Sequence, residues 1–266
     1  MVIEPLLFAE LFALGLVIGY LAGLLGIGGG MLMVPFLVFV LAAQGVGDTV
    51  LVKVAVATSL ASICFTSLSS VWAHHQKGAV LWPVALVLAP GILIGSVAGA
   101  NVAVAMPAKV LTVFFALFVT FSATQMLLNK KPKPGRSLPG SIGMFGVGSV
   151  IGVLSSMVGA GGAFVSVPFM TWCNISIHKA VATSAALGFP IALAGSLAYG
   201  LAGLGRTDLP VGAIGYVYLP GLVSIALGSM LTAPLGARTA HRMDIAPLKK
   251  VYALFLYLMA AYFLFR

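Results

Sequence analysis

The sequence predicts an all-α polytopic membrane protein made of two repeats of about five transmembrane segments each, in inverted topology. Hydrophobic residues make up 61% of the 266 residues and charged residues only 7%, whereas a soluble domain carries about 25% charged residues. The apolar stretches have the length of helices, which keep their backbone hydrogen bonds internal in lipid. A glycine-rich motif also occurs twice, 133 positions apart.

The repeated motif joins a cluster of glycines to a Pro-Phe pair. It runs from Gly26 to Phe36 in the first copy and from Gly159 to Phe169 in the second. Rows of small residues at every fourth position recur at the same offset: Gly15, Gly19 and Gly23 with Gly148, Gly152 and Ser156, and Gly91, Gly95 and Gly99 with Ser224, Gly228 and Thr232. Duplicated halves in a membrane chain are typical of transporters with a site between the repeats.

Five apolar segments can be drawn in each half of the chain. They lie near 5–25, 29–43, 50–73, 79–105 and 108–128, and near 138–158, 162–173, 176–203, 210–234 and 246–265. The second segment of each half is shorter than the roughly 20 helical residues that cross a bilayer. Either it crosses with help from its neighbours, or it dips in and returns. The repeats are therefore 1–128 and 138–266, joined by a basic cytoplasmic linker at 129–137.

The distribution of cations favours ten crossings. With the linker inside, ten crossings place most cations in the cytoplasm: Lys77, Lys130, Lys131, Lys133, Arg136, Lys179, Arg238, Arg242, Lys249 and Lys250. Only four then lie outside: Lys53, Lys109, Arg206 and Arg266. Re-entrant short segments would divide the cations evenly, so the positive-inside rule supports ten crossings. With an odd number of crossings per half, the second repeat is inverted relative to the first. Both termini then lie on the outer side of the cell's inner (cytoplasmic) membrane.

The glycine rows have a packing explanation. A small residue at every fourth position lets neighbouring helix backbones approach closely in lipid. We prefer this interpretation to direct contact with a substrate. The rows could pack within one chain or between two copies, so a homodimer is an open alternative.

The glycine-rich turns are the first candidate for a binding site. Glycine inside a helix costs about 1 kcal/mol relative to alanine, so each cluster predicts an unwound bend. The helix that follows, from about Met31 or Phe164, would direct its free N–H groups at the bend and hold an anion there. The alternative is a pair of ordinary turns at the membrane surface. The candidate residues in these turns are Gly26, Gly28, Gly29, Gly30 and Met31, with Gly159, Gly161, Gly162, Ala163 and Phe164.

A repeated Ala-Thr-Ser segment is the second candidate. Thr58 and Ser59 match Thr183 and Ser184, and such hydroxyls hydrogen-bond to a polar ligand, across helices or back to the preceding turn. Three basic residues lie one turn earlier, where they could attract an anion to a vestibule or extend to the membrane interface: Lys53, His178 and Lys179.

Several functional classes are not supported. The net charge of +9 suits anionic lipid headgroups, and the chain offers no polar surface for nucleic acid. No metal-ligand or nucleophile motif is present, so we predict no catalytic residues, no metal and no cofactor. The N-terminus lacks the basic region of a cleaved signal peptide.

Together, the paired Gly-Gly…Pro-Phe turns at 28–36 and 161–169 and the paired Ala-Thr-Ser segments at 57–59 and 182–184 resemble the TauE/SafE sulfite exporter family. The resemblance covers essentially the whole chain, although Ala163 stands where the first turn has Gly30. It implies transport of a small sulfur-containing anion of the sulfite, sulfonate or sulfoacetate type.

Export by alternating access is the favoured direction of transport. An anion leaving a negative-inside cell gains ~2.3 kcal/mol per charge per 100 mV, so export needs no coupling ion. No acidic side chain suggests a proton relay within a span. The alternatives are a proton-coupled uptake permease, a passive anion channel and, from another class, an intramembrane enzyme.

Overall fold

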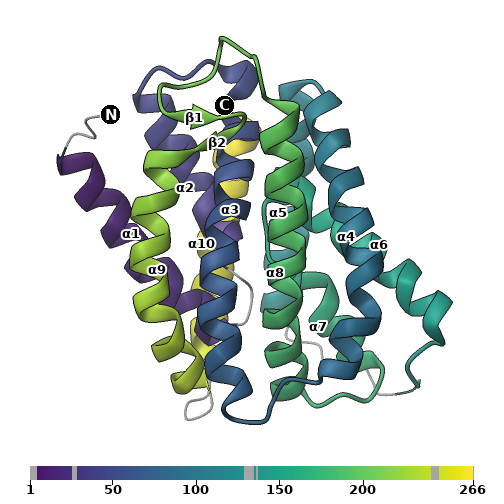
Figure 1. Cartoon of the computed structure of the whole chain (residues 1–266). Helices are drawn as coiled ribbons and strands as arrows, with labels where there is room; N and C mark the ends of the chain where they lie inside the picture. The colour runs from purple at the N-terminus through teal and green to yellow at the C-terminus, as the bar shows by residue number, and fades with distance from the viewer. Residues whose placement is uncertain (1–4, 26–28, 129–134, 136, 241–245, 266) are drawn as a thin grey trace.

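The computed structural model describes residues 5–25, 29–128, 135, 137–240 and 246–265. This part of the chain forms ten α-helices and one two-stranded ribbon (Figure 1). The helices are α1 Pro5–Leu25, α2 Gly30–Ala43, α3 Asp48–His75, α4 Trp82–Ala105, α5 Ala108–Leu128, α6 Ser141–Val158, α7 Ala163–Trp172, α8 Ile177–Ala202, α9 Leu219–Ala240 and α10 Ala246–Phe265. The strands β1 Ala213–Ile214 and β2 Val217–Tyr218 pair antiparallel before α9.

The two short segments are confirmed as separate helices. α2 has 14 residues and α7 has 10. Each begins after a glycine in the left-handed region, Gly29 with φ 72° and Gly162 with φ 81°. Residues with a Cβ adopt this conformation at a cost, whereas glycine does not, so the chain breaks and restarts as a helix at these positions.

The predicted segment at 210–234 is wrong at both ends. Its first part forms the ribbon, because Gly212 (φ 86°) and Gly215 (φ 53°) turn the backbone into conformations that a helix excludes. The helix α9 therefore begins only at Leu219, and it continues through Pro234. Apolar composition alone could not separate these turns from a helix.

Glycine rows join α1 to α9 and α4 to α6, all within one chain. A Cβ on Gly15 would lie 2.6 Å from the carbonyl oxygen of Ile225. Gly19 meets the backbone of Ser229 one turn later, so α1 and α9 run parallel. This confirms the packing interpretation, because such contacts between backbones leave no room for a side chain.

The structure also corrects the register of the second glycine row. Gly91 meets the carbonyl of Phe145 on α6, and its structural counterpart, Gly228, meets Phe12 on α1. Gly236 likewise meets Tyr20. The row therefore repeats at an offset of 137 positions, one helical turn beyond the expected 133, because the chain before α9 has additional residues in the ribbon.

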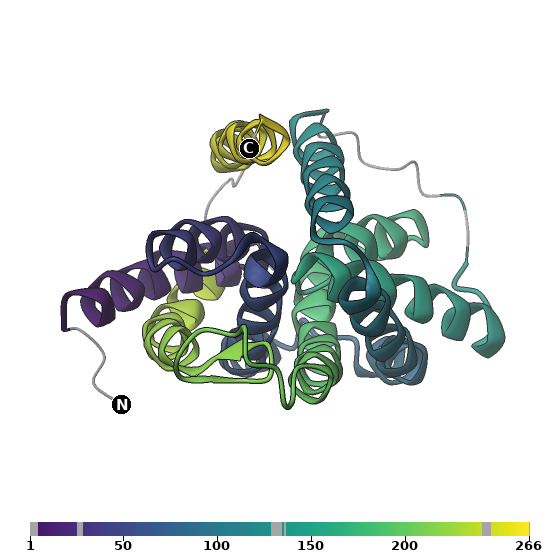
Figure 2. The same cartoon turned by 90° about the horizontal axis from the view of Figure 1, so that it is seen from above.

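The helices form two groups that meet at the centre of the molecule. One group contains α1, α2, α3 and α9, and the other contains α4, α6, α7 and α8, so each includes helices from both halves of the chain (Figure 2). The two groups join through α3 and α8, which run antiparallel. A separate pair, α5 and α10, lies along one side in Figure 2.

Seven of the described helices are long and apolar enough to span a membrane. These are α1, α3, α4, α5, α6, α8 and α9. The protein is therefore a multi-pass membrane protein. α3 is the most buried of them, with 83% of its most apolar window inside the molecule, so it is surrounded by protein rather than by lipid.

Candidate functional site

The two glycine-rich turns meet in the middle of the molecule. A Cβ on Gly30 would overlap the carbonyl oxygen of Gly159 and lie 2.9 Å from the Cα of Ala160. Gly159 is itself left-handed, with φ 72°. The structure thus brings the paired turns together, but the backbones at Gly30 and Gly159 approach too closely for a ligand between them. Gly26 and Gly28 lie outside the described residues.

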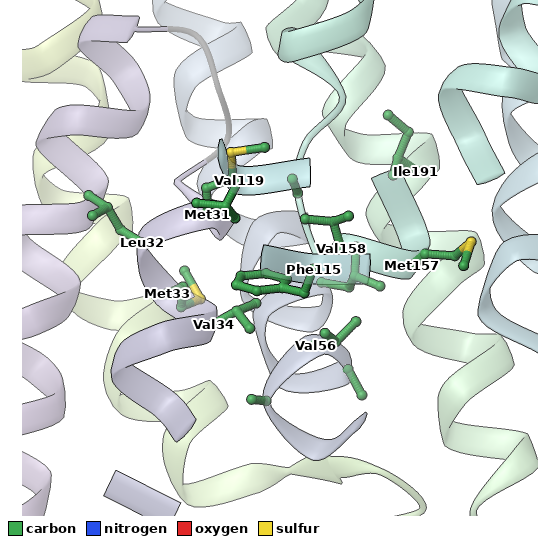
Figure 3. Packing of buried hydrophobic residues seen from close by; sticks show 14 of the residues in the cluster. Met31, Leu32, Met33, Val34, Val56, Phe115, Val119, Met157, Val158 and Ile191 are labelled. Carbon is green, nitrogen blue, oxygen red and sulfur yellow. The ribbon is translucent and has the colours of Figure 1, made fainter. Parts of the chain in front are cut away.

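Apolar side chains surround the first turn of α2. Neither cap residue, Gly29 or Gly162, supplies a side-chain acceptor to the helix that it starts. Met31, Ala163 and Phe164 are buried. Figure 3 shows Met31 among Phe115 and Val119 of α5 and Val158 of α6. These apolar neighbours lower the local dielectric at the start of α2, which strengthens electrostatic interactions with its N–H groups.

The two threonines of the repeated Ala-Thr-Ser segments have structural partners. The Thr58 hydroxyl accepts a hydrogen bond from the Tyr218 N–H at 2.9 Å. The Thr183 hydroxyl accepts one from the Leu81 N–H, also at 2.9 Å. Tyr218 and Leu81 each directly precede a helix, α9 and α4. Each threonine therefore satisfies a donor at the start of a helix from the other half of the chain.

The two serines of these segments lie closer to the turns. Ser59 donates a hydrogen bond to the Gly159 carbonyl at 2.8 Å and ties α3 to the second turn. Ser184 accepts one from Ser166 of α7 at 2.7 Å. Both serines are fully buried.

A small pocket lies beside the second turn, between α1, α3 and α8. Four of its lining residues carry hydroxyls and the others are small: Thr66, Ser67, Ser70 and Ser184, with Ala22, Gly161, Ala185 and Gly188. Its volume of about 10 Å³ is on the order of what one water molecule needs. Gly161 and Ser184 are the predicted site residues that line it.

The three hydroxyls that α3 contributes were not predicted. Thr58, Ser62, Thr66 and Ser70 recur at every fourth residue and therefore form one polar row along α3. That spacing is visible in the sequence and could have identified the row. Thr66 is also joined to Ser229 of α9 by a hydrogen bond of 2.6 Å.

The three predicted vestibule residues do not come together. Lys53 is buried near the start of α3 and donates a hydrogen bond to the Val104 carbonyl at 2.7 Å. This contact suits the C-terminal end of α4, where carbonyls attract a cation. His178 and Lys179 are exposed in the first turn of α8. Because α3 and α8 are antiparallel, these residues lie at the opposite end of the molecule.

An exposed ion pair lies in the loop between α8 and β1. Arg206 bonds both carboxylate oxygens of Asp208, at 2.9 and 2.6 Å. The hydrogen bond to Arg206 lowers the pKa of the Asp208 carboxyl, and the same bond raises the pKa of the Arg206 guanidinium. The pair is solvent-exposed, so it contributes little to stability.

Comparison with known proteins decides the family. A family model described as Sulfite exporter TauE/SafE matches residues 11–263. The chain belongs to the TauE/SafE sulfite exporter family. A probable membrane transporter protein of Haemophilus influenzae is 34% identical over 248 residues, covering 92% of this chain and 94% of that protein.

More distant relatives carry the same description. The probable membrane transporter protein YdhB of Bacillus subtilis is 28% identical over 251 residues, which cover 92% of this chain and 93% of YdhB. A probable membrane transporter protein of Methanocaldococcus jannaschii is 27% identical, and the matched residues cover 86% of this chain and 83% of that protein. No solved structure matches the chain. The protein is therefore a membrane transporter of the TauE/SafE family.

Among the residues that the structure describes, no group of three or more histidine, cysteine, aspartate or glutamate side chains could hold a metal ion. The pocket lining likewise contains no ionisable side chain. What the site offers is hydroxyl groups, a glycine backbone and small apolar walls. Such groups can bind a polar solute by hydrogen bonding.

Proposed function

We propose that this protein is a secondary transporter that exports small sulfur-containing anions of the sulfite, sulfonate or sulfoacetate type. The observation that carries the proposal is the hydroxyl-lined pocket beside the glycine-rich turn, deep in a chain of the TauE/SafE family. Hydroxyl donors and helix starts bind anions without a cationic side chain. An anion so held is not bound too tightly to leave again.

The packing of the helices supports two inverted repeats, 1–128 and 138–266. Exchanging each helix for its counterpart in the other half converts the α1–α9 pair into α6–α4, and both pairs are packed through glycine rows. The same exchange converts the Thr58–Tyr218 bond into the Thr183–Leu81 bond. α1 and α9 run parallel, as expected if the second repeat is inverted. An inverted pair of repeats is the usual basis of alternating access.

The distribution of basic residues between the two ends of the molecule supports the placement of both termini outside the cell. The α2–α3 connection and the ribbon lie at one end of the molecule, and the α3–α4 and α7–α8 connections lie at the other (Figure 1). Lys77 and Lys179 lie at the second end, which we place in the cytoplasm. Lys53 and Arg206 lie at the first.

The direction of transport follows from the charge of the substrate. The membrane potential drives an anion outward, whereas uptake requires a coupling ion. A proton-coupled uptake permease and a passive channel remain the alternative functions.

Flux into proteoliposomes with a clamped membrane potential tests the function. We expect saturable movement of sulfite or methanesulfonate toward the positive side, with counterflow of unlabelled anion and no need for a proton gradient. Flux without saturation or counterflow would indicate a channel. Uptake against the potential that requires a proton gradient would indicate the permease. No flux of either anion would refute the proposal.

A further inference from the structure

One hydroxyl group of the pocket has no hydrogen-bond partner. The Ser70 oxygen is buried, with 4% of the residue exposed, and it neither donates to nor accepts from any of the residues that the structure describes. A buried hydroxyl without a partner costs free energy, and such groups are rare in folded proteins. Ser70 lines the pocket, so a ligand there would supply the missing partner.

The neighbouring hydroxyls are already engaged. Thr66 donates to the Ser62 carbonyl or to Ser229, and Ser67 donates to the Cys64 carbonyl at 3.1 Å. Ser184 accepts from Ser166. Ser70, which makes no hydrogen bond, and Ser184, which only accepts one, are therefore the hydroxyls in this lining that can donate to an anion without breaking a bond.

The charge that this pocket can accept is limited. None of its eight lining residues carries a charge. The desolvation penalty of an ion rises with the square of its charge, whereas the gain from neutral hydroxyl donors rises only in proportion to it. Neutral donors thus favour an anion of single charge over one of double charge.

We propose that the pocket between α1, α3 and α8 is the substrate site, that Ser70 is a specificity-determining donor, and that the site takes monoanions, hydrogensulfite or a singly charged sulfonate. It rejects dianions, namely sulfite, sulfate and, within the proposed substrate class, sulfoacetate. This inference rests on the proposed function. In the conformation described here the pocket is closed to about the size of one water molecule, so α3 and α8 separate to admit the anion.

A pair of serine variants tests the donor. Ser70→Ala removes the pocket hydroxyl, and Ser96→Ala removes another buried hydroxyl without a partner, on α4 and outside the pocket lining. Neither substitution breaks a hydrogen bond, so both proteins should fold. We expect Ser70→Ala to raise the half-saturating methanesulfonate concentration about tenfold or more, the loss typical of a hydrogen bond to a charged group. Ser96→Ala should match the wild type.

A pair of glycine variants tests the pocket itself. A Cβ on Gly188 would lie 3.4 Å from the Ser67 Cβ, so Gly188→Ala adds a methyl group to the pocket wall without a backbone clash. A Cβ on Gly200, on the same helix, meets nothing within 4 Å. We expect Gly188→Ala to reduce flux and Gly200→Ala to leave it unchanged.

The pH dependence of flux and competition by sulfate test the proposed preference for singly charged anions. Methanesulfonate keeps a single charge at all working pH values, whereas sulfite gains a proton and becomes a monoanion as pH falls. Sulfite flux should therefore rise as pH falls while methanesulfonate flux stays constant, and excess sulfate should not compete. Equal inhibition by sulfate and by unlabelled methanesulfonate would overturn the proposed preference for singly charged anions.

The two levels of the proposal fail in different ways. If the wild-type protein carries neither anion, the proposed function is wrong. If the wild type carries them but Ser70→Ala and Gly188→Ala behave like their controls, the function stands and the pocket is not the site.

Discussion

The region beside the second glycine turn and the equivalent region beside the first turn differ in what fills them. α3 and α8 correspond at an offset of 125 positions, so Thr66 corresponds to Ile191 and Ser70 to Gly195. Ile191 is fully buried. Where one side has hydroxyls around a pocket, the other has a closely packed apolar side chain.

The partner of Thr66 shows the same difference. Ser229 corresponds to Ile92 at the offset of 137 that the glycine contacts define. The hydrogen-bonded pair Thr66–Ser229 is thus replaced by two isoleucines, both fully buried. The change is concerted, since a single isoleucine would leave the opposite serine without this partner.

The small residues of the pocket wall are also replaced. Ala185 corresponds to Leu60 and Gly188 to Ile63, and both of these larger side chains are fully buried. The backbone plan is therefore repeated, while the small and hydroxyl-bearing side chains of the described pocket lining are not. The comparison teaches that the repeat supplies the frame, and that residues of α3, α8 and α9 that differ between the repeats supply most of the hydroxyls and small side chains around the proposed site.

The largest effect is expected where the two regions share a contact. Gly30→Ala places a Cβ on the carbonyl oxygen of Gly159, and no side-chain rotation can relieve a clash with backbone. Overpacking costs about 1–3 kcal/mol and occasionally more, and a clash with backbone belongs at the upper end of that range. We expect little monodisperse protein in detergent by size-exclusion chromatography. Gly146→Ala on α6, where a Cβ meets nothing within 4 Å, should elute like the wild type; similar elution of both variants would show that the turns can separate.

The next effect should come from copying the apolar region into the pocket. Thr66→Ile gives α3 the side chain that α8 has at the corresponding position. We expect a folded protein with at least tenfold lower sulfonate flux, because the substitution removes a lining hydroxyl and adds volume that fills the pocket. Thr120→Ile on α5, outside the pocket lining, is the matched control. Wild-type flux in Thr66→Ile would mean that the asymmetry has no part in transport.

Much of the fold could be predicted because lipid imposes simple rules on a sequence. Helix-length apolar runs, glycines at every fourth residue and paired glycine turns each have one dominant structural solution in a bilayer. The ribbon at 213–218 could not be predicted from apolar content. Its course depends on two left-handed glycines and on the burial of Tyr216 and Tyr218 against other helices, which are tertiary facts.

The site was harder to predict because repetition indicates the frame more strongly than the lining. Thr58 and Thr183 recur together, and both prove to bond backbone N–H groups. Ser70 has no repeated counterpart, so a search for duplicated residues passes over it. The hydroxyl spacing along α3 was the available signal, and it is informative only once the neighbours of that face are known.

The smallest effect tests the symmetric part of the comparison. Thr58→Val and Thr183→Val keep the side-chain shape and each leave one N–H, of Tyr218 or Leu81, without its acceptor. An unsatisfied buried donor costs about 1–3 kcal/mol. Thermal unfolding in detergent should show both variants destabilised, Thr58→Val more so because Tyr218 is buried and Leu81 only partly buried.

Thr112→Val on α5 is the control, since its hydroxyl only donates to the Ala108 carbonyl within the same helix and its loss leaves no N–H unpaired. If Thr58→Val destabilised the protein no more than this control, the contact would not stabilise the fold. Thr58 would then be free to serve a ligand, and the frame and the binding groups could no longer be assigned to different residues. Destabilisation of both variants with retained substrate affinity would instead place the two threonines in the repeated frame, leaving affinity to the unrepeated hydroxyls of α3.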